Sequence, residues 1–242
     1  MKQKMIKTDI IVVSYKDQSA MDKCMASVKE HCKDYNLIIE DNNPPNPNRG
    51  FTKAVNDGIK KGNAPYIFLL NQDAIILYGC IETLIERMEN HNKIGIVGPM
   101  QLDPNDQNRI AWGGSAQCFP GGIHKGGLLS MGHCQIPEKQ KWINGAAMLI
   151  RRKMLDEIGL LDENLFLLYS DSDISYVSRR LGWECWFEPR ARVLHTLGKA
   201  SKNSQELAQK DMVAFMKKWG ITTDGKGNFF YSREFALLDT LP

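Results

Sequence analysis

The first hundred residues alternate between short apolar runs and segments with apolar side chains at helical spacing. The runs are rich in β-branched residues and have the length of buried strands; they are Asp9–Ser14, Leu37–Ile39, Tyr66–Leu70 and Gly95–Val97. Strands that alternate with helices are typical of a mainly parallel sheet covered on both faces. The sequence therefore predicts an α/β fold.

Three helices are expected between these strands. The first should begin at Ser19, a residue type that caps helices, with an apolar face that runs from Met21 to Cys32. The second is predicted over Gly50–Lys61 and should end at Gly62, and the third is predicted over Gly79–His91.

The second half of the chain is less regular. Residues 112–132 hold seven of the twenty glycines and predict a mobile loop or an irregular hairpin, and a lid or acceptor loop is one use for it. The elements expected after it are strands at Ala146–Ile150, Glu184–Phe187 and Arg192–Leu194, helices at Lys153–Ile158 and Asp171–Leu181, and a last helix capped by Asn203 and Glu206.

One domain is expected, because no repeat and no linker interrupts the pattern. We place it at residues 1–200, with a nucleotide-binding half over about 1–100 and an acceptor half over about 101–200. Residues 201–242 are expected to form a helical extension packed on it. The amphipathic pattern of 203–219 leaves three roles open: packing on the core, formation of a homodimer, and contact with a membrane surface.

Charge and hydropathy exclude two classes of function. The formal net charge is +3, and no run of Lys and Arg supplies a nucleic-acid surface. The longest apolar runs have about five residues, against about 20 for a membrane span. The N-terminal residues lack the apolar core of a signal peptide, so a cytoplasmic protein is expected.

The six cysteines include no C-x-x-C pair, and reduced thiols are expected. Cys118, His124, His133 and Cys134 could gather around zinc, although their spacing is irregular; scattered loop residues are the alternative.

Polar residues follow three consecutive predicted strands. They are Ser14 and Tyr15, then Asp41, then Asn71, Gln72 and Asp73. Ligands of open parallel sheets bind beyond the carboxyl ends of the strands. An aromatic ring and a carboxylate suit a nucleobase, and a carboxylate near a diphosphate requires a divalent cation between them. Turn chemistry alone is the alternative for each residue.

A second group of polar residues lies near the C-terminal end of the pattern. Asp171 falls in the first turn of a predicted helix, where it could serve as a helix cap or as a reactive carboxylate. Asp173 is expected to be structural, either orienting its neighbours or pairing with Arg179 or Arg180. His195 closes a predicted strand and would face the same site; a surface histidine, or one satisfied by structural contacts, is the alternative.

Several known motifs are absent from the sequence. There is no G-x-x-x-x-G-K-[ST] loop, and no G-x-G-x-x-G follows the first strand, which argues against a P-loop or a typical dinucleotide cradle. No G-x-S-x-G supports a nucleophile elbow.

Seven short segments occur in a distinctive order: SYKD, EDNN, NRGF with Asn56 five residues on, LLNQD, NGAAMLIRR, YSDSDISYVSRRLGW and ARVLH. Over about residues 8 to 200 this order resembles family 2 glycosyltransferases of the rhamnosyltransferase-like type. The resemblance implies a single-domain GT-A fold, a nucleotide-diphospho-sugar donor linked to UDP, dTDP or GDP, and a divalent cation, Mn²⁺ or Mg²⁺. It also implies inversion at the anomeric carbon.

The same resemblance assigns roles on the nucleotide side. Tyr15, beside Ser14, and Asp41 match the residues that bind the nucleobase. Asn48, Gly50 and Phe51 match an N-x-G-F element near the nucleoside. Lys16 replaces the usual Asn after the tyrosine.

Further roles concern the metal, the sugar and the acceptor. Asn71, Gln72 and Asp73 stand where the family has its D-x-D motif, so Asp73 would bind the metal and the diphosphate. His195 matches a histidine that reaches the metal. Gly145 and Ala146 match a turn beside the sugar, and Asp171 matches the catalytic base, preceded here by Ser170 instead of the usual Glu.

The predicted function is therefore an inverting glycosyltransferase with an Asp general base and metal assistance. Its acceptor would be a glycan, a lipid-linked sugar or a protein. Two alternatives stay open: a sugar-nucleotide nucleotidyltransferase, and a non-catalytic protein that binds nucleotide sugars.

Overall fold

The computed structural model describes residues 7–127, 129–196 and 205–240. The strands of its large sheet are β1 (Thr8–Ser14), β2 (Tyr35–Asp41), β3 (Tyr66–Asn71), β4 (Ile75–Ile76), β5 (Ile94–Asp103), β6 (Asp106–Trp112), β9 (Glu138–Lys139), β10 (Ala147–Arg151) and β11 (Glu184–Leu194). The helices are α1 (Gln18–His31), α2 (Phe51–Lys61), α3 (Cys80–Asn90), α4 (Arg152–Ile158), α5 (Ser170–Arg180), α7 (Gln205–Trp219) and α8 (Arg233–Thr240). Two short hairpins complete the list: β7 (Ser115–Gln117) with β8 (Ile123–His124), and β12 (Thr222–Thr223) with β13 (Phe229–Phe230).

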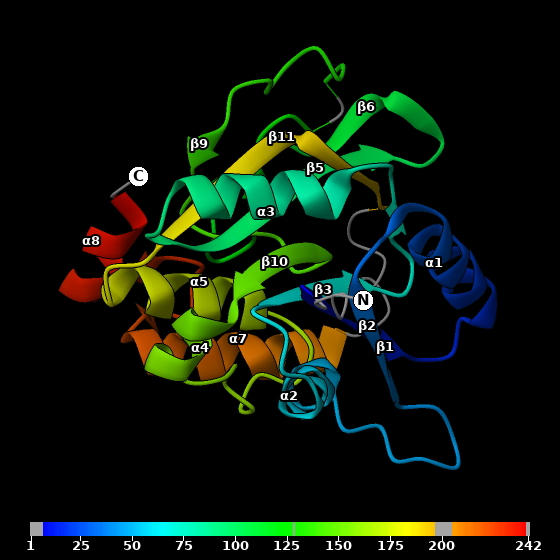
Figure 1. Cartoon of the computed structure of the whole chain (residues 1–242). Helices are drawn as coiled ribbons and strands as arrows, with labels where there is room; N and C mark the ends of the chain where they lie inside the picture. Colours follow the sequence, from blue (N-terminus) through cyan, green and yellow to red (C-terminus); the bar gives the residue numbers. More distant parts are fainter. Residues whose placement is uncertain (1–6, 128, 197–204, 241–242) are drawn as a thin grey trace.

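The main path of the large sheet has the order β2-β1-β3-β10-β5-β11-β4 (Figure 1). Strands β2, β1 and β3 are parallel, as are β5 and β11, whereas β10 is antiparallel to both of its neighbours. Because β10 is antiparallel to both β3 and β5, these two strands point the same way. Five of the seven strands on this path therefore share one direction, and the prediction of a mainly parallel α/β sheet is confirmed.

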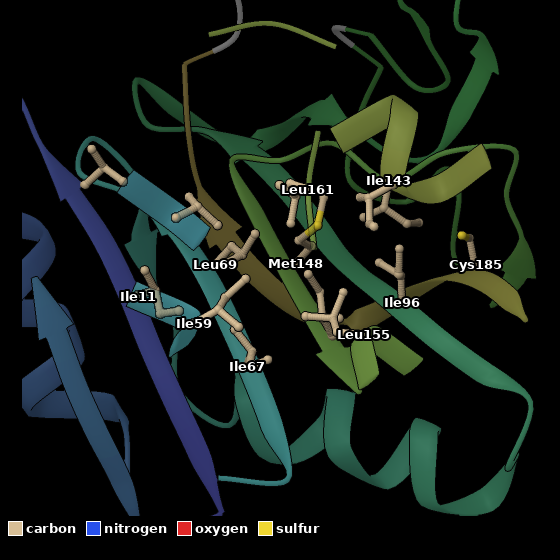
Figure 2. Packing of buried hydrophobic residues seen from close by; sticks show 14 of the residues in the cluster. Ile11, Ile59, Ile67, Leu69, Ile96, Ile143, Met148, Leu155, Leu161 and Cys185 are labelled. Carbon is tan, nitrogen blue, oxygen red and sulfur yellow. The ribbon is translucent and has the colours of Figure 1, made fainter. Parts of the chain in front are cut away.

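Both faces of the sheet are covered by helices (Figure 1). Successive side chains of a strand point to opposite faces, so an unbroken apolar run places apolar side chains on both faces. Ile10 and Val12 of β1 pack in one apolar cluster with α1 and α3, whereas Ile11 and Val13 pack in another with α2, α4 and α5. Figure 2 shows the second cluster, in which Ile59 of α2 lies against strand residues. Strands with two apolar faces explain the unbroken apolar runs in the sequence.

A third cluster joins the C-terminal helices to the rest of the protein. Phe215 and Trp219 of α7 and Phe235 of α8 pack around Tyr176 of α5. The amphipathic face of α7 thus packs on the protein core. The predicted boundary at 200/201 and the predicted cap Asn203 lie outside the described residues.

Asp173 has different partners from those expected. Its carboxylate accepts hydrogen bonds from Lys218 Nζ at 2.7 Å and from Trp219 Nε1 at 2.9 Å, both on α7. Arg179 instead donates to the Lys141 carbonyl, and Arg180 pairs with Glu234. The structural role is as predicted, but the partner was wrong because α7 supplies a cation from 45 residues away.

The first helix begins earlier than predicted. Asp17 caps α1 by accepting from the Ala20 N–H at 3.0 Å, so the prediction of Ser19 as the cap is wrong. Residues Ser115–Gln117 and Ile123–His124 pair with a register shift, which confirms the irregular hairpin in the glycine-rich segment.

Candidate active site

The ends of β1 and β2 are joined by one asparagine. Asn43 Nδ2 donates to Ser14 Oγ at 2.9 Å and to Asp41 Oδ1 at 2.8 Å. Its Oδ1 accepts from the Lys16 N–H at 2.6 Å. The predicted nucleobase residues therefore lie together at the carboxyl edge of the sheet. Sequence reasoning missed Asn43; its place two residues after Asp41 was the available signal.

Asp41 is an exposed carboxylate that stays ionised. Hydrogen bonds from the backbone and side chain of Asn43, and one from Asn46, hold the pKa of Asp41 below its ordinary value. An exposed carboxylate can accept N–H groups of a nucleobase edge at neutral pH.

Gln72 holds the backbone of Tyr15 with two hydrogen bonds. The Tyr15 N–H donates to Gln72 Oε1 at 2.8 Å, and Gln72 Nε2 donates to the Tyr15 carbonyl at 2.6 Å. The ammonium of Lys16 lies 5.0 Å from the centre of the Tyr15 ring.

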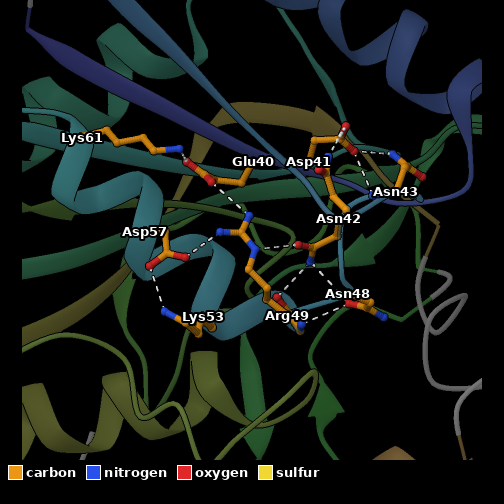
Figure 3. A network of polar contacts seen from close by, with 11 residues as sticks. Glu40, Asp41, Asn42, Asn43, Asn48, Arg49, Lys53, Asp57 and Lys61 are labelled. Carbon is orange, nitrogen blue, oxygen red and sulfur yellow. Dashed lines mark hydrogen bonds and ion pairs between the residues drawn. The ribbon is translucent and has the colours of Figure 1, made fainter.

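A polar network supports the segment between Asp41 and α2 (Figure 3). Glu40, only 2% exposed, pairs with Arg49 and with Lys61, and Arg49 also pairs with Asp57. Arg49 further donates to buried Asn42, whose amide donates to the Gly50 carbonyl. This network fixes the loop that carries Asn48.

Asn48, Gly50 and Phe51 have structural contacts. Asn48 Oδ1 accepts from the Gly50 N–H at 3.0 Å, and the N–H of Phe51 donates to the Phe166 carbonyl at 2.7 Å. Gly50 has φ +83°, and an added Cβ would lie 2.7 Å from the Phe166 carbonyl oxygen. Only glycine fits this position, which brings the start of α2 against the loop before α5.

Asp73 and His195 come together from distant parts of the chain. His195 follows β11, is 6% exposed, and its Nε2 lies 3.6 Å from Asp73 Oδ1. A carboxylate oxygen and an imidazole nitrogen are both ligands that Mn²⁺ accepts. Cations such as Mg²⁺ are commonly held by one or two protein groups together with substrate phosphates. These two residues therefore fit the predicted divalent cation.

Asp171 is bound to the turn that precedes β10. Its Oδ2 accepts from the Gly145 N–H at 2.8 Å, and its Oδ1 accepts from the Ser172 N–H at 2.7 Å. A Cβ on Gly145 would lie 3.0 Å from the Asp171 Cβ, so glycine permits this close approach. Burial raises the pKa of Asp171, against the opposing effect of these hydrogen bonds. A carboxylate with a raised pKa is a better proton acceptor. Ser170, which replaces the family's usual Glu, is only 3% exposed.

The turn at 144–146 connects the two groups of residues. The Asn71 N–H donates to the Ala146 carbonyl at 2.8 Å, while Gly145 holds Asp171. The strand end that leads into Asp73 and the helix that carries Asp171 are thus attached to neighbouring residues of one turn.

A second missed residue anchors the loop before α5. Asp211 of α7 is 1% exposed and accepts three backbone hydrogen bonds, from Phe166 at 2.8 Å and from Leu167 and Leu168 at 2.7 Å each. The loop 166–168 runs directly into α5 and Asp171. No local sequence pattern indicated this contact, because the partners lie more than 40 residues apart.

We expect Asp211→Asn to lower the free energy of unfolding by about 1–3 kcal/mol, the cost of a buried N–H without an acceptor. Asparagine has a single carbonyl oxygen, so its amide group would face one of the three donors. Urea denaturation followed by tryptophan fluorescence measures the change. Glu206→Gln is the control, an exposed carboxylate of the same helix. Equal free energies of unfolding for the two variants would contradict the role of Asp211 as the anchor of the loop 166–168.

The zinc alternative finds no support in the described residues. Cys118 is 1% exposed and packs in the aromatic cluster with Phe119, and no group of three or more His, Cys, Asp and Glu side chains gathers there around a metal position. His124 stacks edge-on against Trp142, and burial, with a smaller effect of His195, lowers the pKa of His124.

The mainly parallel sheet, with an aromatic ring and carboxylates at its strand ends, has GT-A architecture. Residues 1–212 match the model of the family described as glycosyltransferase like family 2, and the chain belongs to this family. The predicted family and fold are confirmed.

Among curated proteins, the chain is similar to an N-acetylglucosaminyl-diphospho-decaprenol L-rhamnosyltransferase of Mycobacterium tuberculosis. The two are 24% identical over 175 residues, which cover 63% of this chain and 57% of that protein. The match thus spans little more than half the length of this relative.

Two solved structures share the fold. A mannosyltransferase from Pyrobaculum calidifontis in complex with GDP-Man and Mn²⁺ has a TM-score of 0.63 at 11% identity, over 97% of this chain and 68% of that chain. GalNAc-T7 with UDP, GalNAc and Mn²⁺ has a TM-score of 0.61 at 15% identity, over 79% of this chain and 44% of that chain.

Proposed function

We propose that this protein is an inverting glycosyltransferase that moves a sugar from a nucleoside diphosphate to an acceptor hydroxyl. One observation carries the proposal. The turn at 144–146 binds both the strand end that leads to Asp73 and the carboxylate of Asp171, so a metal-ligand pair and a basic carboxylate share one edge of the sheet.

On the donor side, Tyr15 would stack on the base and Asp41 would accept its N–H groups. Asn43 and Gln72 hold these two residues in place through the bonds described above. The proposed nucleoside site would also include Ser14, Asn48, Gly50 and Phe51.

Asp171 acts as the general base. It takes the proton of the acceptor hydroxyl as that oxygen forms a bond to the anomeric carbon. The bond from the anomeric carbon to the diphosphate oxygen breaks, and its electron pair leaves with the nucleoside diphosphate. Gly145 and Ser172 N–H groups aim the carboxylate. A single displacement of this kind inverts the anomeric carbon.

Asp73 and His195 would hold a divalent cation, Mn²⁺ or Mg²⁺. When bound, the cation neutralises the charge that develops on the leaving diphosphate. The Mn²⁺ present with UDP or GDP-Man in the two structural neighbours supports this part of the proposal.

The acceptor class is a glycan, a lipid-linked sugar or a protein, and the relative that acts on a decaprenol-linked sugar supports testing the second. No helix in the described ranges has the length and apolarity of a membrane span. We propose a cytoplasmic protein that meets such an acceptor at the inner membrane face.

A donor panel tests the proposal. The protein is incubated with UDP-, GDP- and dTDP-sugars and Mn²⁺, with thermal shift as the measure of binding and release of nucleoside diphosphate as the measure of turnover. We expect one nucleotide class to raise the melting temperature and its sugar to be slowly hydrolysed. Binding with no hydrolysis and no transfer would support a nucleotide-sugar sensor instead.

A further inference from the structure

Gln101 is a buried side chain behind His195 that lies outside the predicted site. It belongs to β5 and is 0% exposed. Its Oε1 lies 3.1 Å from His195 Nδ1, and its Nε2 donates to Asn144 Oδ1 at 3.1 Å. A buried amide with two such partners orients both of them.

The direction of these hydrogen bonds follows from one backbone group. The Ala146 N–H can only donate, and it donates at 2.9 Å to the Asn144 side chain, so the atom that faces it must be oxygen. The same oxygen faces Gln101, which must therefore present its NH₂ group. The remaining atom of the Gln101 amide, Oε1, faces His195 as an acceptor.

An acceptor at this position selects one form of the imidazole. Nδ1 must carry a hydrogen to bond to Gln101, so in the neutral ring Nε2 has none. Nε2 faces Asp73 Oδ1 at 3.6 Å. Nε2 and Asp73 Oδ1 are then both acceptors, and a cation bound between them would stabilise this arrangement.

We propose that Gln101 is a positioning residue that holds His195 in its Nδ1–H form and so presents Nε2, with Asp73, to a divalent cation. The cation part rests on the proposed function, whereas the form of the ring does not. The hydrogen-bonded series also reaches the base, because Asn144 precedes Gly145, whose N–H holds Asp171. The Gln101 amide thus links His195, a proposed metal ligand, to the turn at 144–146 that holds the proposed base Asp171.

The form of the ring is measured by NMR on metal-free protein with ¹⁵N-labelled histidine. The pH is kept well above about 6.5, the ordinary pKa of histidine. The chain has five histidines, and loss of one signal set in His195→Gln assigns the ring. We expect the Nδ1–H form in the wild type. Gln101→Met, of similar shape, should lose it, and Gln101→Glu, which keeps an acceptor, should retain it.

Mn²⁺ affinity is the second readout. It is measured by electron paramagnetic resonance with Mn²⁺ alone and with whichever of UDP, GDP or dTDP stabilises the wild type most. Gln101→Met should weaken Mn²⁺ binding by about 10–100-fold, the usual effect of removing a group that orients a metal ligand. Gln101→Glu, which keeps an acceptor for Nδ1–H, should bind Mn²⁺ more tightly than Gln101→Met. The control is Gln140→Met, a 2% exposed glutamine bonded to Ser115, which should change neither readout.

Three results would overturn the inference: an Nε2–H ring in the wild type, an unchanged ring in Gln101→Met, or unchanged Mn²⁺ affinity in that variant. If the wild type binds a nucleotide with no help from Mn²⁺, the metal part of the proposed function fails. The ring measurement then still decides whether Gln101 orients His195.

Discussion

Asp171→Asn should lower turnover by about 10²–10⁴-fold, the usual contribution of a general base. The amide cannot take the proton of the acceptor hydroxyl, while the proposed donor contacts at Tyr15 and Asp41 are untouched. The dissociation constant of the nucleotide should therefore stay near that of the wild type. Steady-state release of nucleoside diphosphate and calorimetry measure the two effects.

Asp173→Asn is the matched control for this variant. Both carboxylates lie in the first turn of α5, but Asp173 is 1% exposed and bonded to Lys218 and Trp219. Its loss should reduce stability and leave turnover per folded molecule much closer to that of the wild type. If Asp171→Asn kept wild-type turnover, the base would have to be another residue.

The pH profile offers a further check on Asp171. A general base works only when it is deprotonated, so kcat/KM should fall as the pH drops through the pKa of Asp171. Because burial raises that pKa, the fall should begin above the ordinary range of an aspartate.

Asp73→Ala should abolish most of the Mn²⁺ dependence of nucleotide binding. It removes the carboxylate that pairs with His195 Nε2, leaving one protein ligand for the cation. We expect nucleotide affinity in Mn²⁺ to fall at least about tenfold, since even groups that merely orient ligands contribute this much. Titration with and without Mn²⁺ measures the difference.

Asp41→Asn separates the metal from the nucleobase. This carboxylate lies at the end of β2, which β1 separates from β3, and it is assigned to the nucleobase. Its loss should therefore weaken nucleotide binding equally with and without Mn²⁺. If the Asp73→Ala variant kept the wild-type effect of Mn²⁺ on nucleotide affinity, Asp73 would not be a metal ligand.

The sequence predicted the strands of the sheet best where both of their faces are apolar. Strands β1, β3 and β10 were expected within a residue or two of their ends. β11 was predicted as two strands because charged residues and Pro189 interrupt its apolar pattern. In the structure it is one irregular strand, and Glu188, 0% exposed, pairs with Arg87 and Arg190.

The site was partly predictable for a similar reason. Residues at strand ends, such as Tyr15, Asp41 and Asp73, stand at positions that the alternation of elements reveals. Asn43, Gln101 and Asp211 act by holding other groups. For Gln101 and Asp211 these contacts join residues far apart in the sequence, which a local pattern cannot register.

The place of β10 in the sheet limits how this protein can close around a ligand. β10 is hydrogen-bonded to β3 on one side and to β5 on the other, so the strands on its two sides belong to one continuous sheet. Opening the two sides as separate rigid bodies would break backbone ladders in the core. Any closure must therefore come from segments outside the sheet.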